Sequence, residues 1–448
     1  MKKYHQYLCY KESGVEWLGE IPYHWKVERL KWSVNCCQNG IWGNDPDGKN
    51  DFPCVRVADF DRIRNRVNLP IPTMRAIPKS DSQNHILLKG DLLIEKSGGG
   101  DLQPVGVVVL YDINELAICS NFVARMPVKK EYDSNFICFL HSTLYSSRIN
   151  TKSIKQNIGI QNLDTTAYLN EKISVPPLSE QRAIADFLDR ETGRIDALIT
   201  KYRRLMELLE EKRTSLISQA VTKGLDPSVE MKDSGVEWSK KLPESWYVER
   251  LKFNSYMKGR IGWQNLRSDE FTEEGPYLIT GMHFRDGSVD WDACYHVTEE
   301  RYAIAPEIQI QEDDILITKD GSIGKLAHIR SLSEKATLNS HILLIRPRNK
   351  KYYPRYMYFL LGSDIFFQHI LDTQTGTTFF GITQENISDF PAILPPLSEQ
   401  RAIADFLDRE TGRIDLIKEK IMSMITNLKE YRTALISSAV TGKIDVRD

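Results

Sequence analysis

The sequence predicts a mixed α/β protein in which one unit is written twice. We expect two globular domains separated by two long helices that pair as an antiparallel coiled coil, with an internal pseudo-two-fold repeat. Three observations predict this fold. The 21-residue stretch PPLSEQRAIADFLDRETGRID begins at Pro176 and begins again, unchanged, at Pro395. Each copy opens a long apolar stripe of helical period, and the segment before each copy alternates short β-rich runs with Gly, Pro and Asn turns.

The repeat extends along the whole chain. SGVEW occurs at 13–17 and 234–238, VERLK at 27–31 and 248–252, and SLISQAVTKGLD at 215–226 echoes ALISSAVTGKID at 434–445. An internal repeat of this kind sets the domain plan. The predicted parts are a first domain over 1–175, a central helix over 176–225, a second domain over 226–394 and a C-terminal helix over 395–448.

The two long helices each begin after a Pro-Pro pair, with Ser179 and Ser398 as expected N-caps. Apolar residues then recur at alternating steps of four and three, which is the pattern of a coiled-coil seam. Gly193 and Gly412 interrupt both helices, either for close backbone approach or as a kink. The predicted seam residues are Ile184, Leu188, Ile195, Leu198, Leu205, Leu209, Ile403, Leu407, Ile414, Ile417, Met424 and Leu428.

Pairing of the two helices with each other is the simplest way to bury both seams, because one chain supplies two of matching length. The alternative is that each seam binds a different protein.

Composition is that of a soluble globular protein, with 41% hydrophobic and 27% charged residues among 448. The longest apolar runs, such as Val105 to Leu110, are much shorter than the ~20 residues that span a bilayer. The start of the sequence has no apolar signal-peptide region. Seven cysteines lie scattered without C-x-x-C spacing, which argues against disulfides and zinc and favours a reduced, cytoplasmic location.

Net charge is close to neutral and divides unevenly. Residues 1–178 carry 22 basic and 19 acidic side chains, whereas residues 226–397 carry 19 and 25. DNA binding would therefore depend on local patches or on a partner's charge.

No catalytic motif is present. A phosphate-binding loop, H-E-x-x-H, G-x-S-x-G and the [ND]-P-P-[YF] tetrapeptide of amino-methyltransferases are all missing, and the nine histidines are dispersed. We therefore expect a non-catalytic protein with no metal and no cofactor of its own.

Three sets of residues are candidates for contact with DNA. In DRIRNR, Arg62, Arg64 and Arg66 alternate, so on a strand they would share one face, suited to phosphates or guanine edges, or they would lie on a solvated edge strand. Two glycine-containing loops beside cations could approach a DNA backbone or be turns, and GTTFFG could supply hydroxyls or simply pack. The loop candidates are Lys96, Ser97, Gly98, Lys319, Asp320, Ser322, Lys325, Thr377 and Thr378.

These residues resemble a known family. SGVEWLGEIPYHWKVERLK, GDLLIEKSGGG with SNFVARM, TKDGSIGK with LNSHILLIRP, and the twice-used PPLSEQRAIADFLD are similar to the specificity (S) subunits of Type I restriction–modification systems. The resemblance implies two target recognition domains that read the halves of an asymmetric bipartite sequence in double-stranded DNA. It also implies two docked methyltransferase subunits, which bind S-adenosylmethionine and methylate adenine, and restriction subunits in the full complex.

Core packing does not explain why the repeat is identical at positions expected to face outward. One partner bound twice would explain it, as would a recent duplication. The candidate methyltransferase-docking residues are Arg182, Asp189, Arg190, Arg401, Asp408 and Arg409.

The sequence thus favours a DNA-binding specificity subunit. The alternative is a coiled-coil scaffold that displays two protein-binding domains without reading DNA. A nuclease has little support, because no constellation of metal-binding acids stands out.

Overall fold

A computed structural model describes residues 4–78, 84–157, 159–236, 239–260, 266, 270–320, 323–373 and 382–447. The chain divides into two compact units: unit 1 comprises Met1–Tyr202 and Ser423–Asp448, and unit 2 comprises Arg203–Met422. The prediction of a mixed fold with two long helices is confirmed. No helix in the described part of the chain has the length and apolar character needed to cross a membrane.

The two long helices are α4 (Leu178–Lys223) and α9 (Leu397–Val440), and each contributes to both units. Both begin one residue before the serine expected as N-cap, so that Ser179 and Ser398 lie inside the first turn. A Cβ atom added at Gly193 or Gly412 would meet nothing within 4 Å, so neither glycine is required for close backbone approach.

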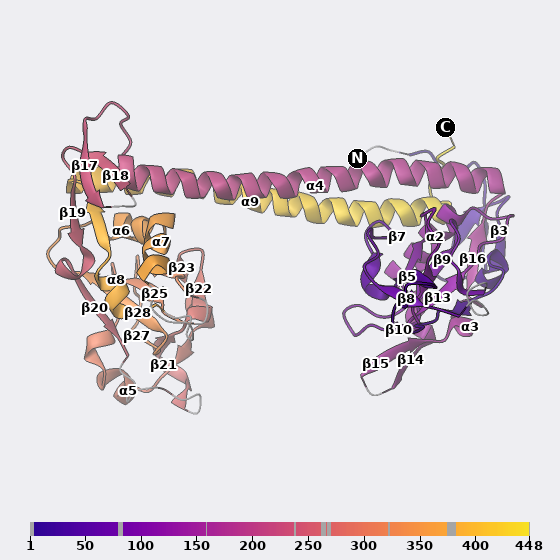
Figure 1. Ribbon diagram of the computed structural model, residues 1–448, viewed down its shortest axis with the longest axis horizontal. Helices are drawn as coiled ribbons and strands as arrows, with labels where there is room; N and C mark the ends of the chain where they lie inside the picture. The colour runs from indigo at the N-terminus through magenta and orange to yellow at the C-terminus, as the bar shows by residue number, and fades with distance from the viewer. Residues whose placement is uncertain are drawn as a thin grey trace. The chain divides into compact units, whose positions relative to one another are not determined.

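Within each unit the helices run antiparallel. In unit 2, Arg213 binds Asp415 at 3.0 Å and Glu210 binds Lys418 at 2.5 Å, so numbers rise along one helix as they fall along the other. In unit 1, Arg432 binds Asp196 at 3.1 Å. Asp196 and Asp415 occupy the same position of the repeat, as do Arg213 and Arg432. Both units therefore contain the same ion pair between α4 and α9, the two long helices labelled in Figure 1.

The predicted seam is correct at its start and then drifts. Ile184, Leu188 and Ile195 are buried, as are their counterparts Ile403, Leu407 and Ile414, and Leu209 and Leu428 are half-buried. Four predicted seam residues are instead exposed. The side chains buried in their place are Ile199 and Ile421, and Met206 and Ile425 are half-buried. A helix with 3.6 residues per turn outruns a 3.5-residue repeat, which displaces the stripe along a helix of this length. The exposed four are Leu198, Leu205, Ile417 and Met424.

Unit 1 is built on a six-stranded sheet of order β4-β13-β9-β11-β7-β6, in which β11 and β7 are parallel and the other pairs antiparallel. Helix α2 and the ends of α4 and α9 share one apolar core with this sheet. The strands are β1 (Tyr10–Glu12), β2 (Glu20–Pro22), β3 (Lys26–Arg29), β4 (Gln38–Asn39), β5 (Asp51–Val55), β6 (Phe60–Asp61), β7 (Arg66–Val67), β8 (Met74–Ala76), β9 (Leu92–Glu95), β10 (Ser97–Gly98), β11 (Val108–Leu110), β12 (Ile118–Cys119), β13 (Val123–Met126), β14 (Ile154–Asn157), β15 (Ile160–Leu163) and β16 (Lys172–Val175). The shorter helices are η1 (Leu30–Ser33), η2 (Val57–Asp59), α2 (Ser134–Ser146), η3 (Ile149–Ser153) and α3 (Thr165–Tyr168).

Unit 2 repeats this plan on a four-stranded sheet of order β20-β28-β25-β26 and a three-stranded sheet of order β24-β21-β27. Its strands are β17 (Met231–Val236), β18 (Ser239–Pro243), β19 (Tyr247–Arg250), β20 (Ser255–Gly259), β21 (Thr272–Ile279), β22 (Phe284–Arg285), β23 (Ser288–Val289), β24 (Tyr295–His296), β25 (Ile315–Thr318), β26 (Leu326–His328), β27 (Ala336–Leu338), β28 (Ile342–Pro347) and β29 (Pro391–Leu394). Its shorter helices are η4 (Leu251–Phe253), η7 (Gly281–His283), η8 (Trp291–Ala293), α5 (Glu299–Ala303), η9 (Pro306–Ile308), α6 (Pro354–Leu361), α7 (Asp364–Thr373) and α8 (Gln384–Ser388).

Each globular part is attached to its helices by the same bonds. The Gln181 side chain accepts from the backbone N–H of Asp133 and donates to the carbonyl of Pro176, and Gln400 makes the same two bonds with Tyr353 and Pro395. The strand that leads into each long helix pairs with the VERLK strand, as β16 with β3 and as β29 with β19. We call this repeated set, the two helices with β3, β16, β19 and β29, the frame.

Candidate nucleic-acid interface

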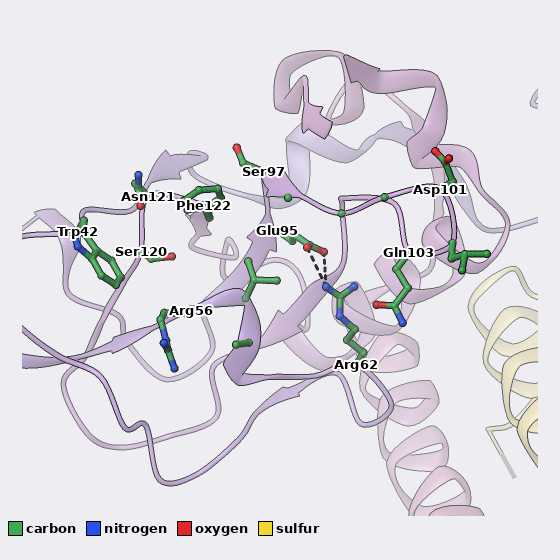
Figure 2. Close-up of a pocket in the computed structure, with 16 residues that line it drawn as sticks. Trp42, Arg56, Arg62, Glu95, Ser97, Asp101, Gln103, Ser120, Asn121 and Phe122 are labelled. Atoms are coloured by element: carbon green, nitrogen blue, oxygen red, sulfur yellow. Dashed lines mark hydrogen bonds and ion pairs between the residues drawn. The ribbon is translucent and has the colours of Figure 1, made fainter. Parts of the chain in front are cut away.

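A pocket of about 1010 Å³ borders the six-stranded sheet of unit 1. The glycine-rich loop after β9, the turn before β6 and the loop before β13 surround it (Figure 2). We call it the Arg62 pocket. Its lining residues include Trp42, Arg56, Arg62, Glu95, Ser97, Gly98, Gly99, Asp101, Gln103, Ser120, Asn121 and Phe122.

An ion pair lies in the wall of this pocket. One terminal nitrogen of Arg62, Nη2, donates to both carboxylate oxygens of Glu95 at 3.0 Å (Figure 2). The Glu95 side chain is only 1% exposed, and Arg62 is 29% exposed. Burial raises the pKa of Glu95, and the Arg62 guanidinium opposes that rise. Glu95 therefore holds Arg62 in a fixed position at the pocket wall.

The prediction that three arginines share one strand face is wrong. Residues 62–65 form the turn between β6 and β7, where the Asp61 carboxylate accepts from the backbone of Ile63 and Arg64, and Asn65 has a φ of 55°. Asp and Asn both favour such turns, and these signals outweigh the alternation of the arginines. As a result, Arg62 binds Glu95, while Arg64 is exposed with only a 3.9 Å contact to Asp61.

Arg66, the third of these arginines, points to the frame instead. It donates to Asn135 at 2.6 Å and to Asp189 of α4 at 3.2 Å. Of the three arginines, only Arg62 lines the Arg62 pocket.

The glycine-rich loop forms another wall of the pocket. Ser97 and Gly98 form β10, in which the Ser97 hydroxyl donates to Asn162, and Lys96 donates to Asn39 at 2.9 Å. At Gly99, φ is 65° and a Cβ atom would lie 2.7 Å from the backbone nitrogen of Val105. Only glycine fits there, so this turn of the loop requires a glycine at position 99.

Arg56 is a pocket residue that the sequence reasoning missed. Its backbone N–H donates to the buried Asp59 carboxylate at 2.8 Å, which fixes the start of η2, and its side chain is 39% exposed. The sequence contains a signal for this position, because FPCVRVADF places Asp59 three residues after Arg56, a spacing at which the aspartate can cap a turn. Asn121 and Gln103 carried no comparable signal.

In unit 2 the predicted loop is only partly described. Lys325 donates its backbone N–H to the Thr318 hydroxyl at 2.9 Å, Lys319 donates its N–H to the carbonyl of His341, and Asp320 accepts from the His341 ring. Ser322, Thr377 and Thr378 lie outside the described residues.

The two units present different chemistry at equivalent positions around this region. The same backbone hydrogen bonds identify the pairs: Asp59 N–H to Arg56 matches His283 N–H to Thr280, and Lys96 N–H to Phe122 matches Lys319 N–H to His341. Several positions of the Arg62 pocket therefore have counterparts in unit 2, and four of these pairs carry side chains of different chemistry. The pairs are Arg56 and Thr280, Glu95 and Thr318, Ser120 and Asn339, and Phe122 and His341.

The four arginines among the candidate docking residues of the frame fall into two pairs. Arg190 and Arg409 stack over Phe187 and Phe406 at 5.7 and 5.6 Å. Arg182 and Arg401 are exposed.

Asp189 and Asp408 are engaged inside their own unit. Asp189 binds Arg66, and Asp408 binds Arg330 at 3.0 Å and Arg355 at 2.5 Å. Each of these aspartates ties its globular part to the frame, which gives its identity in the repeat an internal reason, and partner docking at both stays a prediction.

Comparison with known proteins identifies the family. A family model described as the Type I restriction modification DNA specificity domain matches twice, over residues 47–207 and 263–427. The putative type I restriction enzyme MjaX specificity subunit of Methanocaldococcus jannaschii is 24% identical over 98% of both chains. The type I restriction enzyme EcoKI specificity subunit of Escherichia coli is 21% identical over 69% of this chain and 66% of its own.

Solved structures share the fold. One, described as the structural basis underlying complex assembly and conformational transition of the type I R-M system, aligns with a TM-score of 0.71 at 17% identity, covering 94% of this chain and 98% of its own. The HsdS subunit from Thermoanaerobacter tengcongensis aligns with a TM-score of 0.54 at 17% identity, over 95% and 98% of the two chains. With two matched domains that cover most of its length, the chain belongs to the family of Type I restriction–modification specificity subunits, whose named members are specificity rather than catalytic subunits.

Proposed function

We propose that this chain reads an asymmetric bipartite sequence in double-stranded DNA and directs two methyltransferase subunits to it. Unit 1 reads one half-site and unit 2 the other. The methyltransferase subunits bind S-adenosylmethionine and methylate adenine, and restriction subunits join them in the full complex.

The observation that supports this proposal most is the contrast between the frame and the pocket. The frame repeats one interhelical ion pair and its glutamine hydrogen bonds in both units. The pocket positions on the same backbone differ in charge and hydrogen-bonding character, as Arg56 against Thr280 and Glu95 against Thr318. A frame that is the same in both units, carrying pockets with different side chains, suits two different half-sites. Phosphate contacts fix the position of a protein on DNA, and contacts with base edges specify the sequence.

The Arg62 pocket offers groups that match base edges. Arg56 and Arg62 can donate to guanine, Asn121 and Gln103 can pair with adenine, and carboxylates such as Asp101 can accept from the cytosine amino group. Glu95 already orders the Arg62 side chain, so little conformational entropy remains to be lost if its guanidinium contacts a base.

Docking of two partner copies is supported by the repeat itself. Arg182 with Arg401, and Arg190 with Arg409, display the same exposed guanidinium groups once in each unit. Reversing the charge of Arg182 and Arg401 together should weaken methyltransferase binding while the chain stays folded.

A selection experiment tests the proposal. The chain co-expressed with its methyltransferase is used to enrich DNA from a random duplex library, and the bound fraction is sequenced. The expected result is one motif with two dissimilar specified halves and an unspecified spacer of fixed length. Arg56→Ala with Gln103→Ala should change the specified bases of one half only. Enrichment of no motif would favour the scaffold alternative.

A further inference from the structure

Two exposed aromatic rings stand at the same position of the repeat. The VERLK strand is followed by Trp32 in unit 1 and by Phe253 in unit 2, in the short helices η1 and η4. The backbone supports both in the same way, since Leu30 N–H donates to Glu171 and Leu251 N–H donates to Phe390. Trp32 is 53% exposed and Phe253 is 58% exposed. An isolated exposed aromatic is ordinary, but one repeated in both copies of a frame suggests a repeated contact.

Both rings carry cations beside them. Lys31 and Lys129 lie 5.6 and 5.9 Å from the centre of the Trp32 ring, and Lys252 lies 5.7 Å from that of Phe253. A hollow of about 810 Å³ adjoins Trp32 and is lined by Arg29, Lys129 and Lys172 together with Glu28 and Glu131.

The neighbouring tryptophan of the same segment behaves differently. Trp25 is fully buried, and its indole N–H donates to Glu180 at 3.0 Å. Its counterpart Trp246 is equally buried and donates to Glu399 at 2.9 Å. Of these two repeated aromatic positions, one is buried in each unit and the other, Trp32 or Phe253, is exposed to solvent.

We infer that Trp32 and Phe253 are twin docking residues for a protein partner that binds in two copies, one per unit, through an apolar pocket with an acidic rim. Aromatic side chains are typical of the centres of protein interfaces, and the lysines beside these two rings suit the polar rim, where they would face acidic groups of the partner. Duplex DNA is a poorer occupant, because its bases are stacked and present no flat face to an exposed ring unless the helix is wedged open. The inference rests on the proposed function, in which the twice-bound partner is the methyltransferase subunit.

The test measures how many methyltransferase subunits bind the full-length chain, by native mass spectrometry at a partner concentration tenfold above the wild-type Kd. Wild type should bind two. Trp32→Ala and Phe253→Ala should each bind one, because truncating an interface aromatic weakens its site about 30-fold or more. At that concentration a site weakened 30-fold is about 25% occupied, so most copies of the double variant should bind none. Trp32→Phe and Phe253→Trp should keep two, since each places the other unit's ring at the site.

Tyr23→Ala is the matched control. Tyr23 is also exposed, at 67%, and has Lys11 5.6 Å from its ring, but its position in unit 2 is Glu244. It should leave both copies bound. Two copies on the double variant would overturn the inference and leave the proposed function intact, whereas a wild-type chain that binds no methyltransferase would overturn both.

Discussion

The Arg62–Glu95 pair allows a sharp prediction, because one partner of it is almost completely buried. Arg62→Met removes the guanidinium and leaves the Glu95 carboxylate, 1% exposed, without its ion-pair partner. Removing one partner of a buried pair costs about 3–5 kcal/mol, a large part of the ~5–15 kcal/mol that stabilises a typical domain. At roughly 2–4 °C per kcal/mol for a unit of this size, the melting temperature of unit 1 should fall by roughly 6–20 °C.

The matched control comes from the same hexapeptide. Arg64→Met removes an exposed guanidinium whose nearest carboxylate is 3.9 Å away, so its cost should be below about 1 kcal/mol. The assay is thermal unfolding combined with hydrogen exchange of the β9 amides, which reports on unit 1. Equal destabilisation by the two variants would refute the reasoning.

The pH dependence of the Arg62→Met variant provides a second arm. Burial raises the pKa of Glu95, and without Arg62 that pKa should rise further. The folded state then holds the proton more tightly than the unfolded state, so stability falls as pH rises from the unfolded pKa to the folded one. The loss of unfolding free energy in Arg62→Met, relative to wild type, should therefore be smaller at pH 5 than at pH 8. A deficit independent of pH would mean that lost packing, and not buried charge, is responsible.

Three further predictions follow from the helices and the core. Asp196→Asn should destabilise unit 1 by more than Asp415→Asn destabilises unit 2, because the first carboxylate is 12% exposed and the second 51%; urea unfolding of each variant measures this. Burial lowers the pKa of His141 to about 3, so below the unfolded value of ~6.5 stability should fall by about 1.4 kcal/mol per pH unit, and His141→Gln should show a shallower fall in acid unfolding curves. Gly193→Ala should raise stability by up to about 1 kcal/mol in thermal melts, because the added methyl group meets nothing within 4 Å.

The two long helices and their pairing could be predicted from the sequence, because a long apolar stripe and an exact repeat are strong signals. The register of the seam could not. Leu198 and Ile417 are equivalent in the repeat and both are exposed, so the same reasoning failed twice for the same cause. A heptad pattern assumes 3.5 residues per turn. The residues that are buried are set by the actual helix, with about 3.6 residues per turn, and by the globular part that packs on it.

In the candidate site, too, the sequence predicted the region but not the contacts of individual side chains. The glycine-rich loop with Ser97 and Gly98 was predicted as a contact region and does line the Arg62 pocket. The three alternating arginines suggested a strand, and the turn chemistry of Asp61 and Asn65 prevailed over it. Glu95 could not be singled out, because nothing in a buried run such as DLLIEK indicates that the distant Arg62 would come to bind its carboxylate.

Asp189 and Asp408 illustrate a different difficulty. Identity in the repeat suggested a shared external partner, but each carboxylate binds arginines of its own unit. The arginines come from different elements, Arg66 from strand β7 of unit 1 and Arg355 from helix α6 of unit 2. A single sequence gives no sign that two unlike elements meet the same residue.

The central claim is that one frame supports two different DNA readers, and adenine methylation of the source cell's genome tests it most directly. Single-molecule long-read sequencing with and without this gene would detect every methyladenine motif. The account predicts loss of one bipartite motif with dissimilar halves, and its restoration with only one half altered when a chain carrying Arg56→Ala and Gln103→Ala is supplied. A methylome that stays unchanged when the gene is removed in a cell expressing the methyltransferase would contradict it.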